Sequence, residues 1–149
     1  MTANSEAQAG KIVGKTAAAG FQIGVRRTLP ISPEQMWSFL TSSEGLALWL
    51  GQFPEPLTIG VGEPFASSQG LTGKFTVVKP ALQVRLKWQK PEWSKPSTLQ
   101  IRLLSDRPDK TTIAFHQEHL DSAETRESMK LLWEDVLQAI EHKVKLIDG

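Results

Sequence analysis

The sequence predicts an α+β domain in which one long C-terminal helix packs across a curved antiparallel sheet of about six strands. Three observations support this prediction. Residues 57–119 show only strand-like patterns joined by short connections, residues 122–147 form a single amphipathic pattern, and two short helical segments follow the first strand. An antiparallel sheet with one apolar face needs a cover, and only the last helix is long enough to provide it.

The first strand and the two short helices are indicated by alternation and by capping residues. Apolar and polar residues alternate over 21–27, which predicts a strand with one buried face. The run Ser32-Pro33-Glu34-Gln35 predicts a helix N-terminus closed by a capping box. Ser42 begins a second short helix and Gly51 ends it.

The middle of the chain predicts an antiparallel meander. The clearest alternation places Leu82, Val84, Leu86 and Trp88 on the inner side of one strand. Three further segments alternate in the same way and a fourth does so weakly; they are 71–79 (with Leu71, Gly73, Phe75 and Val77 inward), 99–103, 111–118 and, weakly, 63–67. Hairpin-length links between these strands favour antiparallel pairing.

The last helix begins near Ser122 and carries one apolar stripe. The stripe comprises Met129, Leu132, Trp133, Val136, Leu137, Ile140 and Val144, at helical spacing. About 25 residues at 1.5 Å each give a rod of roughly 37 Å, which is enough to cross a small domain. A single rod on a curved sheet covers it incompletely, so we expect an apolar hollow between the two.

Composition narrows the class of partner. The 17 basic residues balance the 16 acidic ones to a formal charge of +1, which predicts no nucleic-acid partner and no anionic membrane partner. Cysteine is absent, and no segment is as apolar as a membrane span or a secretion signal, so we expect a cytoplasmic protein. Residues 1–20 are polar and predicted to be a mobile tail, and 21–147 a single domain.

The order of these elements resembles the helix-grip fold of the START-like, or birch-pollen-allergen-like, superfamily (SRPBCC). Four local runs are similar to its AHSA group, which is named for the C-terminal domain of the activator of the heat-shock-protein-ninety ATPase. They are SPEQMW at 32–37, GLALWLG at 45–51, TIAFH at 112–116 and MKLLW at 129–133. The likeness covers about residues 21–146 and implies the helix-grip fold. It also implies a carrier or sensor of hydrophobic molecules, with cyclases, hydrolases and a chaperone co-factor among relatives.

Aromatic residues are the candidate lining of the expected hollow. Trp37 and Trp133 lie on core stripes, and Trp133 also faces the sheet. Trp49 ends the helix pair, Trp88 ends a strand and Trp93 lies in a loop, so all three are expected near a cavity mouth. The complete candidate ligand-binding set is Trp49, Phe53, Phe65, Phe75, Trp88, Trp93, Phe115, Met129 and Trp133.

The remaining candidate sites give little support for metal binding, catalysis or phosphate binding. His116 and His119 are three residues apart, which on a strand points them to opposite faces, and no third ligand accompanies them, so no metal site is predicted. No nucleophile elbow or paired carboxylates occur, so no catalytic residue and no cofactor is predicted. The run AGKIVGKT at 9–16 matches a permissive phosphate-loop pattern but lacks the preceding buried strand and following helix.

The sequence therefore favours a domain that binds a hydrophobic, flat or aromatic small molecule between the sheet and the last helix, without a catalytic apparatus. Two alternatives stay open. One is a cyclase- or hydrolase-like enzyme in the same cavity, with His116 or Glu118 as acid or base. The other is a protein-interaction module that contacts a chaperone.

Overall fold

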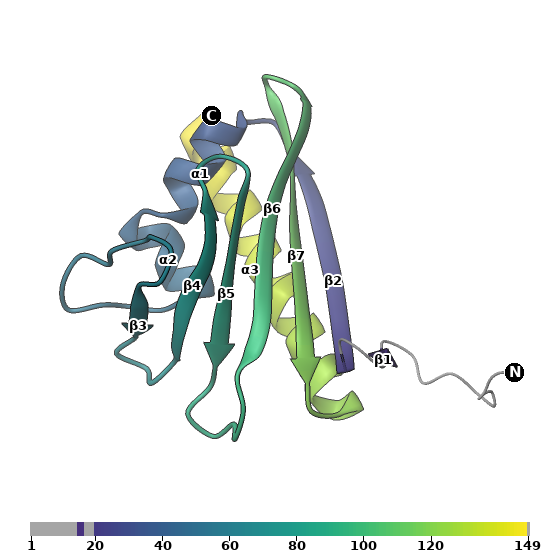
Figure 1. The fold of residues 1–149 in the computed structure, drawn as a ribbon. Helices are drawn as coiled ribbons and strands as arrows, with labels where there is room; N and C mark the ends of the chain where they lie inside the picture. The colour runs from purple at the N-terminus through teal and green to yellow at the C-terminus, as the bar shows by residue number, and fades with distance from the viewer. Residues whose placement is uncertain (1–14, 17–19, 149) are drawn as a thin grey trace, which may run out of the picture.

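The computed structural model describes residues 15–16 and 20–148, which form one sheet covered by helices on one side (Figure 1). The strands are β1 (Lys15–Thr16), β2 (Gly20–Leu29), β3 (Pro64–Ala66), β4 (Thr72–Lys79), β5 (Gln83–Gln89), β6 (Ser97–Arg107) and β7 (Lys110–Leu120). The helices are α1 (Pro33–Leu40), α2 (Ser43–Trp49) and α3 (Ala123–Asp148). Within the described residues all strand pairs are antiparallel, in the order β1-β2-β7-β6-β5-β4-β3. This confirms the predicted α+β, helix-grip architecture.

The short helices begin where their capping residues predict. The Ser32 side chain accepts a hydrogen bond from the Gln35 backbone N–H, and the Gln35 side chain accepts one from the Ser32 N–H, so the capping box is complete. Ser42 caps α2 by accepting from the N–H of Gly45. These two caps fix where the chain turns after β2, and they bring α2 against α3 at one end of the sheet (Figure 1).

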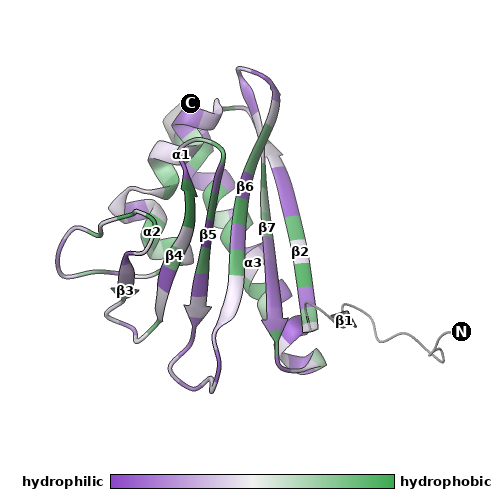
Figure 2. Cartoon of the chain, in the orientation of Figure 1, coloured by the Kyte–Doolittle hydropathy of each residue, from purple (hydrophilic) through white to green (hydrophobic). Residues whose placement is uncertain are grey.

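The core lies between the sheet and α3, which runs behind the sheet in the view of Figure 2. Buried residues alternate with partly exposed ones along β5 and β7, and the buried ones belong to the same core cluster as the apolar stripe of α3. Six stripe residues are at most 5% exposed: Met129, Trp133, Val136, Leu137, Ile140 and Val144. Among the described residues, no helix is long and apolar enough to span a membrane.

Two inward assignments are wrong, and both fail at strand irregularities. Leu82 is 60% exposed because it belongs to the β4–β5 turn, where its N–H donates to the Lys79 carbonyl. Val77 pairs with the outward-facing Arg85, since a bulge between Phe75 and Val77 shifts the register by one residue. After the bulge Val78 takes the inner position and packs against the core.

The predicted tail falls mostly outside the described residues. Of residues 1–20, positions 1–14 and 17–19 are not described. Lys15 and Thr16 form β1, which pairs with Phe21 and Gly20 of β2. The phosphate-loop-like run at 9–16 therefore lies largely outside the described residues, and its last two residues belong to a strand.

Candidate functional site

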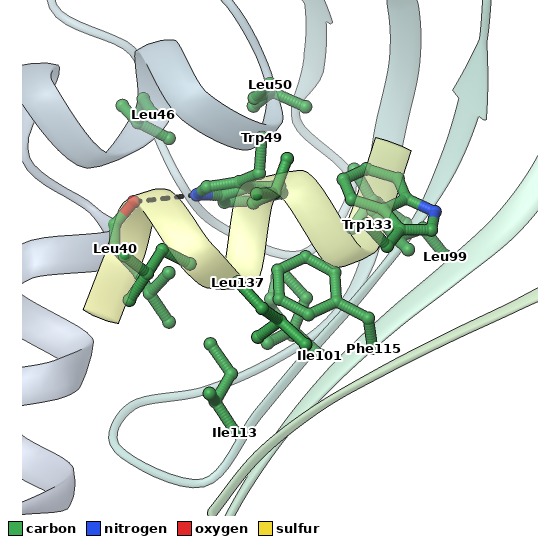
Figure 3. Packing of buried hydrophobic residues seen from close by; sticks show 14 of the residues in the cluster. Leu40, Leu46, Trp49, Leu50, Leu99, Ile101, Ile113, Phe115, Trp133 and Leu137 are labelled. Atoms are coloured by element: carbon green, nitrogen blue, oxygen red, sulfur yellow. Dashed lines mark hydrogen bonds between the residues drawn. The ribbon is translucent and has the colours of Figure 1, made fainter. Parts of the chain in front are cut away.

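Aromatic rings fill the centre of the interface between the sheet and α3. The Trp133 ring stacks on Phe115 of β7 with ring centroids 4.9 Å apart, and it meets Trp88 of β5 at 5.4 Å. Trp133 and Phe115 are each 1% exposed. Figure 3 shows them packed among aliphatic residues of β6, β7 and α3. The two elements interdigitate here, so the hollow expected beneath the helix is not centred on this point.

One concavity lies at the α2 end of this interface. It has a volume of about 580 Å³ and is bounded by α2, the β3–β4 connection, the β5–β6 loop and α3. We call it the tryptophan groove, since Trp49, Trp88 and Trp133 lie along its floor. Its remaining lining residues are Ala47, Leu48, Leu50, Gly51, Gln52, Ser67, Gln69, Leu71, Lys90, Pro91, Glu92 and Leu132. The volume falls within the range of small-molecule sites in proteins.

The segment that follows α2 forms one wall of the groove. Gly51 has a φ of +126°, and a side chain at this position would come within 2.7 Å of the Ser67 Cβ. Only glycine fits such a conformation next to another segment. The close approach brings Gln52 to Gln69, whose side-chain carbonyl accepts from the Gln52 N–H at 3.0 Å. The α2 end and the β3–β4 connection are thereby joined across the groove wall.

The indole N–H groups of the floor are all bonded within the protein. Trp49 donates to the Leu40 carbonyl at 3.0 Å, a bond drawn in Figure 3. Trp88 donates to the Trp49 carbonyl at 3.3 Å. Trp133 donates to Oε1 of Gln117 at 2.7 Å. These donors are satisfied, and Trp49, Trp88 and Trp133 are at most 3% exposed, so the floor presents a guest with a small area of ring carbon and no free indole N–H.

Gln117 anchors this floor from below. It is fully buried, and its side-chain NH₂ donates to Ser97 Oγ at 2.8 Å. Ser97 in turn donates to the Trp88 carbonyl at 2.6 Å. The chain Trp133–Gln117–Ser97–Trp88 ties α3, β7, β6 and β5 together. Each buried polar side chain in it has a partner, so the network stabilises one arrangement of the two rings.

The rim of the groove is partly apolar and carries one charge of each sign. Leu48 of α2 and Leu132 of α3 are half-buried and pack against the core, and Ala47 beside them is exposed. Lys90 and Glu92 come from the β5–β6 loop, where the Lys90 ammonium sits 5.9 Å from the centre of the Trp93 ring. An apolar guest would thus meet leucine side chains above the aromatic floor.

Comparison with known families matches residues 30–145 to the family described as activator of Hsp90 ATPase homolog 1-like protein. The chain belongs to this family. No curated protein matches its sequence. The match spans α1 through nearly all of α3, so this AHSA1-like chain has its groove within the family's own region, whereas the core also includes Ile23 and Leu29 of β2, which precede the match.

Solved structures share the fold at low sequence identity. An HSP90 activator from Plasmodium falciparum is 20% identical with a TM-score of 0.72, and the match covers 83% of this chain and 96% of that chain. The Aha1 dimer from Colwellia psychrerythraea is 19% identical with a TM-score of 0.63, covering 80% and 92%. DynU16, from the dynemicin biosynthetic locus, is 16% identical with a TM-score of 0.72; the match covers 83% of this chain and 47% of DynU16. The AHSA1-like chain thus spans about half of DynU16.

The nine predicted lining residues do not gather in one cavity of the AHSA1-like chain. Trp49, Trp88 and Trp133 line the tryptophan groove. Phe53 lines a neighbouring hollow of about 630 Å³ between α2 and residues 51–57. Trp93 and Met129 line a third concavity of about 340 Å³. The three remaining residues, Phe65, Phe75 and Phe115, pack in the core.

The histidine and glutamate candidates of the AHSA1-like chain lie away from the groove. His116 is on the outer face of β7, with Nε2 3.0 Å from the Gln22 side-chain oxygen. Glu118 is also on that face and forms an ion pair with Arg85 at 3.5 Å. An acid–base role for either residue inside the groove is excluded by this placement. Among the described residues, no group of three or more His, Cys, Asp or Glu could hold a metal ion.

Sequence reasoning missed the polar anchor and the leucine rim of the AHSA1-like chain. A signal for Gln117 was present, since it follows Ile113 and Phe115 at inward positions of the same strand. A glutamine there predicts a buried polar side chain that needs partners. Leu48 gave no comparable signal, because its place on the rim depends on how α2 docks against α3.

Proposed function

We propose that this chain binds a flat, hydrophobic small molecule in the tryptophan groove. One observation carries the proposal: a groove of about 580 Å³ has a floor of three indoles whose N–H groups are already bonded. Such a floor favours a guest that presents a planar apolar face with few hydrogen-bonding groups. Binding would be driven by removal of apolar surface from water, at roughly 25 cal/mol per Å² before ordering costs.

The proposed site differs from a closed carrier cavity. The guest would lie at the mouth between α2 and α3, while the rings beneath stay packed around Trp133. Leu48 and Leu132 would cover its edges, and Lys90 and Glu92 would remain near solvent. We therefore expect selection by the thickness and breadth of the guest, with polar substituents tolerated where they point out of the groove.

Saturable quenching of tryptophan fluorescence by a hydrophobic dye or a flat polyphenol tests this proposal. Leu132→Gln removes an apolar rim contact and should weaken binding about fivefold, since losing part of a leucine contact costs about 1 kcal/mol. Leu131→Gln is the matched control, because Leu131 is the preceding residue of α3, is 64% exposed and is not among the groove residues. A titration without quenching across a panel of polycyclic compounds, or equal weakening in both variants, would contradict the proposal.

A second candidate function is contact with a chaperone. It is favoured by the family description and by the likeness to the Plasmodium falciparum protein, which is named as an HSP90 activator. The test is a pull-down of purified Hsp90 with the immobilised chain, together with the chaperone's ATPase rate. Retention of Hsp90 with a raised ATPase rate supports this candidate, and neither retention nor stimulation at tens of micromolar chain ends it.

A further inference from the structure

The outer face of the sheet, on the side away from α3, carries an unbalanced positive charge. Cross-strand pairing arranges its outward side chains in rows, and three of these rows carry the charged residues. The first row runs through Arg26, Ala114, Arg102, Gln83 and Lys79. The second runs through Gly24, His116, Gln100, Arg85 and Val77. The third runs through Glu118, Thr98, Lys87 and Lys74.

We call these three rows the outer basic face. They hold six of the 17 basic residues and one of the 16 acidic residues, so eleven basic and fifteen acidic residues remain elsewhere, a formal charge of −4. The net charge of +1 therefore hides a separation of charge between the sheet's outer face and the rest of the molecule. Figure 2 views this side of the sheet. Separated charge of this kind creates a local field that attracts an oppositely charged partner.

Most cations of this face have no carboxylate to neutralise them. Arg85 pairs with Glu118 at 3.5 Å. Within the described part of the chain, none of the other five lies within 4.0 Å of a carboxylate oxygen. Lys87 has only a neutral partner, the Thr98 hydroxyl at 3.1 Å. A partner that brings carboxylates would therefore displace water and not existing ion pairs.

The spacing of the first row indicates what kind of acidic partner fits. Arg26, Arg102 and Lys79 lie on every second strand, and neighbouring strands are about 4.8 Å apart, so these cations are about 10 Å apart along the row. The intervening Ala114 and Gln83 are uncharged. Residues seven apart on an α-helix are separated by about 10.5 Å. Carboxylates at that spacing on one helix face match the three cations.

We propose that the outer basic face binds an acidic α-helical segment of another protein, laid across the strands along Arg26, Arg102 and Lys79. Gln83, between Arg102 and Lys79, donates to Gln100 and keeps its own side-chain carbonyl as an acceptor for the polar flank of such a helix. The site is on the opposite side of the sheet from the tryptophan groove, so its occupant is independent of the guest proposed above.

Nucleic acid and lipid fit this face less well. Duplex DNA carries one charge per about 1.7 Å of axis, a much denser array than cations about 10 Å apart. The three rows contain no Phe, Trp or Tyr on which single-stranded bases could stack. They also present only one large apolar side chain, Val77, and the adjoining row Thr28–Thr112–Leu104 adds only Leu104, whereas membrane-surface binding gains much of its affinity from apolar contacts.

The test is fluorescence anisotropy with a labelled helical peptide that carries glutamates seven residues apart. The triple variant R26Q/K79Q/R102Q removes the row, and K95Q/K110Q/K130Q removes the same charge from positions outside the three rows. We expect the row variant to bind at least tenfold more weakly at 50 mM salt and the control to bind within about twofold of the parent chain. Affinity should also fall as salt is raised.

Three results would overturn the inference. They are the absence of peptide binding at 50 mM salt, an equal loss in both triple variants, and binding of a DNA duplex as tight as that of the peptide. The single reversal Arg102→Glu, at the centre of the row, keeps the test usable if the triple variant does not fold. That variant is expected to lose at least fivefold in peptide affinity, and an unchanged affinity would equally refute the site.

Discussion

Removal of the Trp133 indole should be among the most damaging single changes in this chain. Truncating a fully buried tryptophan to alanine costs about 3–5 kcal/mol in lost transfer energy and residual cavity. The change also takes away the donor that satisfies Gln117, and a buried carbonyl left unpaired adds about 1–3 kcal/mol. We therefore expect Trp133→Ala to lower the free energy of unfolding by about 5 kcal/mol. That is a large share of the total free energy of unfolding of a typical domain, which is about 5–15 kcal/mol.

The hydrogen bond can be separated from the packing by a double-mutant cycle. Trp133→Phe keeps an aromatic ring but removes the N–H, and Gln117→Leu removes the acceptor while keeping an apolar side chain of similar length. Each single change leaves one buried polar group unpaired, so each should cost about 2 kcal/mol. The double variant leaves neither the indole N–H nor the amide carbonyl, so its cost should fall short of the sum by about 1 kcal/mol or more.

Urea unfolding followed by circular dichroism gives the free energy of unfolding of the parent chain, the two single variants and the double variant, and the same assay is used for Trp133→Ala. For 149 residues, about 5 kcal/mol corresponds to a melting temperature lower by roughly 10–20 °C, which a thermal scan would show independently. A loss below about 2 kcal/mol for Trp133→Ala would mean that the interface closes around the missing ring. Additivity within about 0.3 kcal/mol in the cycle would mean that the Trp133–Gln117 bond contributes nothing net.

Two further substitutions test local features. Gly73→Ala should cost about 3 kcal/mol or more, because its Cβ would collide with the Lys87 carbonyl of β5; Gly24→Ala is the control, since its Cβ meets no atom closer than 3.8 Å and should change stability by less than about 1 kcal/mol. Urea unfolding of both variants checks this, and equal losses would contradict it. Ser32→Ala removes one half of a capping box and should cost about 1 kcal/mol in the same assay, whereas a loss below about 0.3 kcal/mol would show that the Gln35 bond alone holds the cap.

The fold was predictable because its signals are local. The capping box at Ser32 and the cap at Ser42 are set by residues three apart, and the stripe of α3 repeats at helical spacing whatever it packs against. Alternation identified the strands for the same reason. The alternation pattern gave the wrong side for Val77 and Leu82. A bulge precedes Val77 and a turn contains Leu82, and neither irregularity interrupts the alternation of apolar and polar residues in the sequence.

The site was predictable only in part. A hollow depends on whether the side chains of elements that are distant in the sequence fill the space between those elements. Sequence placed Trp133 on the apolar stripe of the last helix and Phe115 on the inner face of its strand. Whether two rings at that distance leave a cavity or fill it is a question of packing, and a centroid separation of 4.9 Å fills it. The concavity then appears between α2, α3 and the β5–β6 loop, at a position set by how the two helices dock.

The same packing suggests how the groove would select its guests. Its floor is held by hydrogen bonds from three indoles, and moving any of them would leave a buried donor unpaired at a cost of about 1–3 kcal/mol. A guest would gain more by adapting to the floor than by displacing it, because a typical apolar contact returns only about 1 kcal/mol. The rim has no such restraint, since Leu48 and Leu132 are held by apolar packing alone. Differences in guest preference are therefore expected to follow the rim residues, while the three tryptophans set only the flat shape that every guest must share.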